Sequence, residues 1–422
     1  MQQAEVRLLE VDEAIGDQTE RELTFWLLRH GLTDDDEMAL LEGFCARLLS
    51  MGVPLTRAAC GTNLLHPIFE ARGVIWRRGK GVERQDYGRE VMQKDSEDWA
   101  RSPFNKLIQM KEEQPSQVVR ELRRRLDDSY ERGEFPMLDR FQDEGVTDYL
   151  GMAIRMAPHA SLGDIHGLLS SWTTERPGGF TDSQAQLLRR LAPAFALAYK
   201  AIASVQTGRV LMATYLGADA GRRVLEGEIQ RGKAETVQAV LWYSDLQGFT
   251  RIADTTPKDE LLGLLNDYAD CIVTKVQDHG GQVLKFVGDG ILAMFPLDDG
   301  NGACARALNA AQRVRVGFER INARRADEGK PTTSFYLSLH VGEVLYGNIG
   351  SRDRLDFTVV GPAVNEVARI EAMCRSLDQW VIVSAAFAQA AGEARERLVG
   401  LGRYALRGVR RPEELFTLDP ES

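Results

Sequence analysis

Cysteine and long apolar runs are both scarce in this 422-residue sequence. The cysteines number five, are widely separated and form no CxxC pair; they are Cys45, Cys60, Cys271, Cys304 and Cys374. This pattern argues against a disulfide framework and against a zinc site, so we expect reduced, buried thiols. No uncharged apolar run reaches about 18 residues, and the opening MQQAEVRLLEVDEA lacks the basic flank and apolar core of a signal peptide. We therefore expect a soluble, cytoplasmic protein.

Positive charge is in deficit as well. The chain has 52 lysines and arginines against 62 acidic residues, a formal charge of -10. This balance argues against broad binding to nucleic acid or to an anionic membrane, although a local basic pocket for a small anion stays open. Hydrophobic residues make up 44% and charged residues 27%, which is typical of globular proteins. The length indicates two or three domains, because single cores rarely exceed about 250 to 300 residues.

The first 205 residues show few clear patterns. Strand-like pieces such as GVIWRR and DYLGMAIRM lie between a helix near 35–51 and a terminal helix capped by Thr181 or Asp182. The arginine-rich run RELRRRLDD, residues 120–128, is interpreted as a solvated helix face. In the terminal helix a heptad pattern covers Leu188, Leu191, Phe195, Ala198, Ile202 and Val205. Its short length leaves two readings open, a dimer helix or an amphipathic helix covering its own core.

A boundary is expected near 206–235, where glycines and the polar stretch GEIQRGKAET precede the β-type run VQAVLWYS. Downstream, the pattern predicts a mixed series of strands and helices: strand 237–244, helix 258–279, hairpin 282–295, helix 303–322, strands 335–349 and 355–360, a helix from Pro362, and a strand near 380–384. Helices alternating with antiparallel hairpins indicate an α+β sheet with helices on one face.

Two aspartates stand at the ends of apolar strands. Asp245 ends the run VLWYSD and is followed by a glycine turn into a helix, and Asp289 lies in a predicted hairpin turn before Gly290. Each has an ordinary explanation, helix capping for the first and turn chemistry for the second. If the hairpin pairs beside the first strand, the carboxylates meet, and a divalent metal best stabilises such a pair.

Three further polar residues stand out. Lys285 alternates with Leu284 and Phe286 and is turned to the other face of its strand. Asn365 and Arg369 follow Gly361 and Pro362 at helical spacing, so they share one helix face. Taken singly, each is equally consistent with ordinary surface polarity.

In combination, these segments resemble the catalytic domain of the class III nucleotidyl cyclases over roughly residues 236–420. The resemblance implies a ferredoxin-like βαββαβ domain that binds two Mg²⁺ ions per site, for which Mn²⁺ can substitute. It places the metal ligands on Asp245, Leu246 and Asp289. It further implies that Lys285 and Thr358 select the purine, and that Asn365 and Arg369 stabilise the transition state.

The phosphate contacts follow from the same resemblance and from the glycine turn. The amides of Gly248, Phe249 and Thr250 can face phosphate at a helix start. A cation for the triphosphate is expected near the last strand, where Arg407 is preferred to Arg410 and Arg411. One departure from the family is Pro362, where many relatives carry Asp or Asn; proline suits a first helical turn, and we expect little effect on the chemistry.

The implied activity is an adenylate cyclase that converts ATP to 3′,5′-cyclic AMP and pyrophosphate. Lys285 can donate to adenine N1, and Thr358 can accept from the adenine amino group, whereas guanylyl cyclases tend to carry Glu at the lysine position. The alternatives are a guanylate cyclase and a catalytically silent nucleotide-binding dimer. A diguanylate cyclase is disfavoured because GGQVLKFVGDG lacks the acidic GG-D/E-E-F turn.

The resemblance also implies a homodimer with active sites at the subunit interface, where one chain supplies the aspartates and the other supplies the remaining residues.

Residues 1–205 faintly resemble a GAF-type sensory domain of the α/β class through WTTERPGGFTDSQAQLLRRLAPAFALAY. We expect residues 1–205 to form this regulatory domain for an unknown small-molecule effector, 206–235 a helical linker, and 236–422 the cyclase domain. His66, His159 and His166 could suggest haem or metal sensing, but satisfied or exposed histidines are the more ordinary reading. No nucleic-acid or membrane partner is expected.

Overall fold

The computed structural model describes residues 18–34, 36–88, 97–110, 118–156, 167–297, 302–407 and 412–420. Four residues discussed above lie outside these ranges: His159, His166, Arg410 and Arg411. The chain divides into two compact units, residues 1–211 and 212–422. Helix α6 (Asp182–Leu216) begins in the first unit and ends in the second.

The first unit is built on a six-stranded sheet with the order β3-β2-β1-β6-β5-β4. Its strands are β1 (Arg57–Asn63), β2 (Phe69–Arg77), β3 (Gly81–Gly88), β4 (Val119–Arg125), β5 (Asp148–Arg155) and β6 (Gly167–Thr174). Besides α6, its helices are α1 (Gln18–Thr33), α2 (Glu37–Ser50), α3 (Glu97–Ala100), α4 (Pro103–Gln109) and α5 (Pro136–Asp143). Every pairing in this sheet is antiparallel, so the unit is α+β, and the prediction of an α/β class was wrong.

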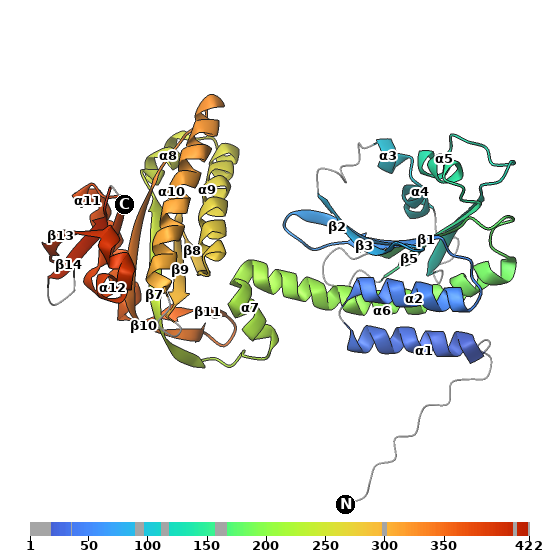
Figure 1. Cartoon of the computed structure of the whole chain (residues 1–422), viewed down its shortest axis with the longest axis horizontal. Coiled ribbons are helices and arrows are strands. Elements are labelled where there is room, and N and C mark those ends of the chain that lie inside the picture. Colours follow the sequence, from blue (N-terminus) through green and yellow to red (C-terminus); the bar gives the residue numbers. More distant parts are fainter. Residues whose placement is uncertain are drawn as a thin grey trace, which may run out of the picture. The chain divides into compact units, whose positions relative to one another are not determined.

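Helices cover both faces of this sheet (Figure 1). The larger core lies between the sheet and α1, α2 and α6, and a smaller core lies under α4 and α5. Strand β5 shows how alternation divides them, because Leu150 enters the larger core and Tyr149 the smaller one. At the start of α6, the Thr181 hydroxyl accepts a hydrogen bond from the Gln184 amide at 3.2 Å, which confirms Thr181 as the cap.

The heptad residues of α6 pack inside their own unit. Leu188, Leu191, Phe195, Ala198 and Ile202 are buried in the larger core, whereas Val205 is 49% exposed. The reading as an amphipathic helix that covers its own domain is therefore confirmed, because a dimer seam through these side chains would require them to be exposed.

The arginine-rich run is a strand, so its interpretation as a helix face was wrong. Arg120 to Arg125 belong to β4, which pairs along its length with β5. The carboxylate of Asp148, which is fully buried, accepts a hydrogen bond from Arg123 at 2.7 Å. Pairing of the backbone with β5 and this ion pair outweigh the helix preference of Arg, Glu and Leu.

The second unit contains an eight-stranded sheet. Its strands are β7 (Ala234–Leu246), β8 (Gln282–Val287), β9 (Gly290–Pro296), β10 (Phe335–Gly350), β11 (Leu355–Val360), β12 (Val381–Ser384), β13 (Leu398–Tyr404) and β14 (Glu413–Leu418). The helices are α7 (Ala218–Leu225), α8 (Phe249–Thr255), α9 (Lys258–Asp278), α10 (Ala303–Asp327), α11 (Pro362–Leu377), α12 (Ala385–Ala390) and a 3₁₀ turn η2 (Gly392–Arg397). These bounds confirm the predicted strands and helices to within a few residues, although α10 runs longer than predicted.

The order β10-β7-β9-β8 within this sheet is that of a ferredoxin-like βαββαβ unit. Its three pairings are antiparallel. Helices α9 and α10 pack on one face, against Val240 and Trp242, and α11 packs on the other, against Ala239 and Leu241 (Figure 1). The expectation of helices on one face was therefore wrong. Strand β7 has apolar side chains on both faces, which is the sequence sign of a doubly covered strand.

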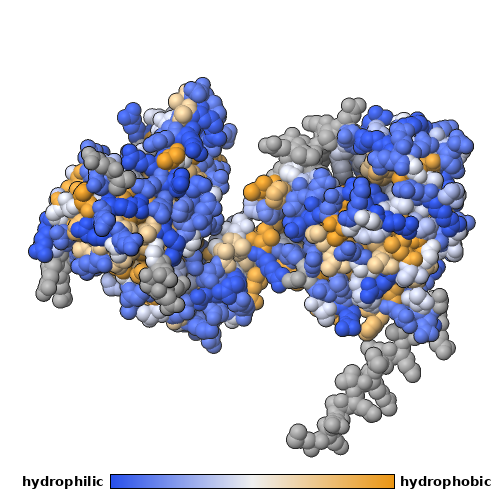
Figure 2. Space-filling model, in the orientation of Figure 1, coloured by the Kyte–Doolittle hydropathy of each residue, from blue (hydrophilic) through white to orange (hydrophobic). Residues whose placement is uncertain are grey.

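All five cysteines are free, and all but the half-buried Cys271 are buried, which confirms reduced thiols. Polar and charged residues cover most of the visible surface of each unit (Figure 2). Among the residues that the structure describes, no helix has the length and apolarity needed to cross a membrane.

Candidate active site

Two strands bring the predicted aspartates together. Asp245 lies near the end of β7, and Asp289 lies in the turn that leads into β9, the neighbouring strand. The Leu246 amide donates a hydrogen bond to Asp289 Oδ2 at 3.2 Å. This confirms the expectation that the hairpin pairs beside the first strand and that the carboxylates meet.

Glycine at position 290 permits this approach. A Cβ atom there would lie 2.8 Å from the Ser244 carbonyl oxygen and 3.2 Å from Asp245 Oδ1. The turn itself uses Gly288, whose φ of 64° is left-handed. The turn is therefore formed by Gly288 and Asp289, one residue earlier than the Asp289–Gly290 pair that the sequence suggested.

The electrostatics of the pair favour a cation. Burial raises the pKa of Asp245 to about 7, with further contributions from a hydrogen bond to Asp289 and from the charges of Asp289 and Glu371; the Leu246 amide acts in the opposite direction. Like charges held this close disfavour double ionisation, and a divalent ion removes the conflict.

The residues present fit such an ion in part. Within the described ranges, no group of three or more His, Cys, Asp or Glu side chains could hold a metal. The two carboxylates would therefore need oxygen ligands from the backbone or from a substrate. Leu246 has a buried, apolar side chain, so it can act as a ligand only through its carbonyl oxygen.

Glu371 is a site residue that the sequence reasoning missed. It lies on α11, it contributes to the raised pKa of Asp245, and its own pKa is raised by burial and by the charge of Asp289. A signal was present, because Glu371 falls four residues after the buried Val367 and next to the buried Ile370. A carboxylate beside an apolar helix stripe needs an explanation, and its proximity to the aspartate pair supplies one.

The two purine-selecting candidates lie on strands that approach each other but do not pair. Lys285 is exposed on β8, opposite Leu292 of β9, and β11 carries Thr358 and approaches β8. Thr358 is only 5% exposed, and its hydroxyl has no hydrogen-bond partner among the residues that the structure describes. Buried hydroxyls nearly always have a hydrogen-bond partner, so this unpartnered hydroxyl is a candidate for binding a ligand.

Asn365 and Arg369 lie one turn apart on α11, whose first helical residue is Pro362. Asn365 is exposed and Arg369 half-buried. The helix is anchored to β10, because the Ser338 hydroxyl donates to the Val367 carbonyl at 2.7 Å and the Cys374 thiol to the Leu337 carbonyl at 3.3 Å.

The charged residues of α11 influence the pKa values of different carboxyl groups. Burial and Glu413 raise the pKa of Glu366, whereas Arg369 opposes them. On the Asp245 carboxyl, by contrast, α11 acts through Glu371. Within one chain the aspartate pair thus has an acidic neighbour on this helix.

The phosphate contacts stay predictions. Gly248 has a left-handed φ of 66°, and Phe249 and Thr250 begin the short helix α8. Arg407 is exposed after β13.

Residues 232–419 match the family model of the adenylate and guanylate cyclase catalytic domain, and this part of the chain belongs to that family. The curated protein "Adenylate cyclase" of Anabaena cylindrica is 34% identical over 151 residues, which cover 35% of this chain and 29% of the relative. "Adenylate cyclase 1" of Rhizobium meliloti is 28% identical over 177 residues, which cover 41% and 26% respectively. The chain thus spans less than a third of either relative.

Among solved structures, the adenylyl cyclase CyaB from P. aeruginosa is similar at 22% identity and a TM-score of 0.40. The similarity covers 44% of this chain and 96% of that one.

Proposed function

We propose that this chain is an adenylate cyclase that converts ATP to 3′,5′-cyclic AMP and pyrophosphate and works as a homodimer with active sites between the subunits. The observation that carries the proposal is the convergence of Asp245 and Asp289 inside the family-matched domain. Two adjacent carboxylates with an acidic neighbour have little use in a purely structural role, because each raises the electrostatic cost of the others.

Asp245, Asp289 and the Leu246 carbonyl are the groups that would hold Mg²⁺, and Mn²⁺ would bind the same oxygen ligands. When bound, the ions lower the pKa of the ribose 3′-hydroxyl and neutralise phosphate charge. The remaining work is positioning, because the 3′-oxygen attacks the α-phosphate in line and pyrophosphate leaves without a covalent intermediate.

Arg369 and Asn365 have complementary roles in this proposal. The Arg369 guanidinium would donate hydrogen bonds to the α-phosphate as its charge grows, a contribution of about 3 to 4 kcal/mol by comparison with other preorganised donors. Asn365 would hold the ribose so that the attacking oxygen faces phosphorus. The amides at Gly248, Phe249 and Thr250 and the guanidinium of Arg407 are assigned to the triphosphate in the same proposal.

Base selection depends on hydrogen-bond donors and acceptors. Adenine N1 accepts a hydrogen bond, and Lys285 can donate one; guanine N1 carries a proton and needs an acceptor. The Thr358 hydroxyl can accept from the exocyclic amine of adenine, but a hydroxyl can also donate to the guanine carbonyl, so the proposed preference for ATP rests on Lys285.

The N-terminal unit is proposed to be a GAF-like regulatory domain that senses a small molecule, with α6 and α7 as the helical connection. A cytoplasmic location belongs to the same proposal, since ATP is the substrate.

The test is turnover of the purified full chain with ATP or GTP in the presence of Mg²⁺ or Mn²⁺. The proposal expects cyclic AMP and pyrophosphate from ATP, less product from GTP, and loss of product when Asp245 and Asp289 are both changed to Asn. Asp270→Asn, an exposed aspartate on α9, is the matched control. Nucleotide binding without pyrophosphate release would favour the silent dimer, and preference for GTP would favour a guanylate cyclase.

A further inference from the structure

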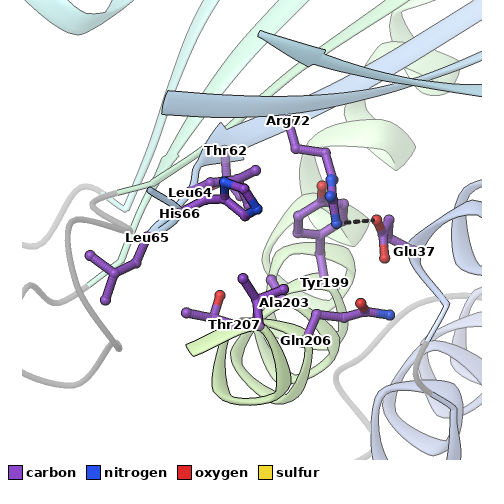
Figure 3. A pocket seen from close by; sticks show the side chains of 11 residues that line it. Glu37, Thr62, Leu64, Leu65, His66, Arg72, Tyr199, Ala203, Gln206 and Thr207 are labelled. Atoms are coloured by element: carbon purple, nitrogen blue, oxygen red, sulfur yellow. Dashed lines mark hydrogen bonds and ion pairs between the residues drawn. The ribbon is translucent and has the colours of Figure 1, made fainter. Parts of the chain in front are cut away.

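The hollow beside α6 in the first unit is too small for an organic ligand (Figure 3). Thr62, Tyr199 and Ala203 are among its lining residues, and it offers about 20 Å³ of space, which is room for a water molecule. An effector of the proposed regulatory domain would therefore need a different site.

In the second unit, a buried hydrogen-bond network holds the segment that precedes β10. Tyr268 on α9 is fully buried, and its hydroxyl accepts a hydrogen bond from the Thr333 amide at 3.2 Å and donates one to Asn322 Oδ1. The Asn322 side chain, on α10, in turn donates to the Thr333 carbonyl at 2.8 Å. Side chains from two helices therefore bind both backbone polar groups of Thr333 and fix this residue in place.

Thr333 and its neighbour in turn hold Gln247. The Thr333 hydroxyl donates to the Gln247 carbonyl at 2.7 Å, with a longer contact of 3.1 Å to the Ser334 carbonyl. The Gln247 amide donates to the Ser334 carbonyl at 2.9 Å. Both backbone groups of Gln247 therefore point toward the segment that precedes β10.

The position of Gln247 makes these bonds relevant to the candidate active site. It lies between Leu246, whose carbonyl is assigned to the metal, and Gly248, whose amide is assigned to phosphate. In a planar trans peptide the C=O and N–H groups point in opposite directions. The Gln247 N–H points toward Ser334, so the Leu246 carbonyl points away from it. The Gln247 carbonyl points toward Thr333, so the Gly248 amide points away as well.

A further hydrogen bond shows what lies on the opposite side. The Leu246 amide donates to Asp289 Oδ2 at 3.2 Å. In an extended strand the N–H and C=O groups of one residue point to the same side, so the Leu246 carbonyl faces the side on which Asp289 lies. The Gly248 amide, which points away from Thr333, faces that side too.

We propose that Thr333 is a positioning residue of the cyclase site. Its hydroxyl orients the two peptide groups that flank Gln247, and the backbone acceptor and donor on the opposite side then face the aspartate pair. Groups that are already oriented cost less to order when the nucleotide binds. The orientation is a property of the backbone, whereas its use in catalysis rests on the proposed function.

The main test is Thr333→Val, which removes the hydroxyl and keeps the shape of the side chain. The Gln247 amide should exchange with deuterium at least about tenfold faster, measured by mass spectrometry at residue resolution, because this residue is no longer held. With ATP and Mg²⁺, kcat/KM should fall about tenfold or more, because small displacements of positioning groups are costly. Thr333→Ser keeps the hydroxyl and should stay within about threefold of the wild type in both measurements.

Thr417→Val is the matched control. Thr417 is also buried, and its hydroxyl donates to the Val381 carbonyl at 2.7 Å, a bond of the same kind between β14 and β12. Because the lost bond does not involve Gln247, exchange at Gln247 and kcat/KM should each change by less than about twofold. Tyr268→Phe is a second variant that guards against misfolding of Thr333→Val. It releases the Thr333 amide and should produce the same two effects, each of about threefold or more.

The two readouts separate this inference from the proposed function. Unchanged exchange at Gln247 in Thr333→Val overturns the inference, whatever the turnover. Faster exchange with wild-type kcat/KM, or an equal loss of kcat/KM in Thr417→Val, indicates a purely structural role and overturns it as well. If the wild-type chain makes no cyclic product, faster exchange still supports the orientation of these peptide groups, and only the proposed function is removed.

Discussion

If active sites form between subunits, two inactive variants should restore each other's activity. The changes are Asp245→Ala in one chain and Arg369→Ala in the other, one from each predicted half of the site. Each single variant should lose about 10²- to 10³-fold in turnover, the usual cost of removing a transition-state donor or a metal ligand. A mixed dimer would combine both defects in one site and leave the other site intact.

The size of the recovery follows from symmetry. One chain carries the predicted residues of both halves of the site, so a homodimer has two equivalent sites. Each mixed dimer has one intact site of two, so mixed dimers isolated through both tags should recover about half of the wild-type turnover; without isolation, random pairing makes about half of the dimers mixed and the expected recovery is about a quarter.

The assay is cyclic AMP production after co-expression of differently tagged chains, with mixed dimers isolated through both tags. Asp270→Ala on α9 and Arg375→Ala on α11 are exposed controls, which should leave turnover close to wild type. If doubly tagged mixed dimers form and turnover stays at the level of the single variants, the interface model is refuted.

Three other predictions concern specificity, metal binding and pH. Lys285→Glu should reduce the ATP-to-GTP preference about tenfold or more, measured as a ratio of kcat/KM values; an unchanged ratio would contradict the base-selection argument. Glu371→Gln should weaken the apparent affinity for Mg²⁺ about threefold in a magnesium titration of turnover, because it removes one of three like charges; an unchanged affinity would show that Glu371 does not act on the bound ion. Burial lowers the pKa of His340 from 6.5 to about 4, although the Glu366 carboxylate, 3.3 Å from Nε2, acts in the opposite direction. Below pH 6.5 the unfolded chain therefore binds a proton more readily than the folded chain. Stability should be complete above pH 6.5 and lower by at most about 2 kcal/mol at pH 5, and urea denaturation of His340→Gln should lack this share of the loss.

The second unit could be predicted from its sequence because its signals are local and agree with one another. The bounds of β11 were predicted to the residue and those of α9 to within one residue, whereas β7 begins three residues earlier and ends two later than predicted; an apolar alternation or a helical period fills each segment. The meeting of Asp245 with Asp289 needed one further assumption, that the hairpin pairs beside β7. The structure confirms it.

Other features depend on contacts that a single sequence does not display. The arginine-rich strand β4 reads as a helix until its pairing with β5 is known. The role of Glu371 becomes visible only when α11 is placed on the sheet beside Asp289. The heptad pattern of α6 could not separate a dimer seam from a core-facing stripe, because both put apolar residues on one helix face.

The buried thiols make this chain a convenient host for spectroscopic probes. Burial raises the pKa of all five cysteines, Cys271 included, so few of them are thiolates at neutral pH. Thiol-directed labels react with the thiolate, so they should prefer a single cysteine introduced on the exposed side of α6. A spin label or fluorophore placed there could follow movements of this helix without replacement of any native cysteine.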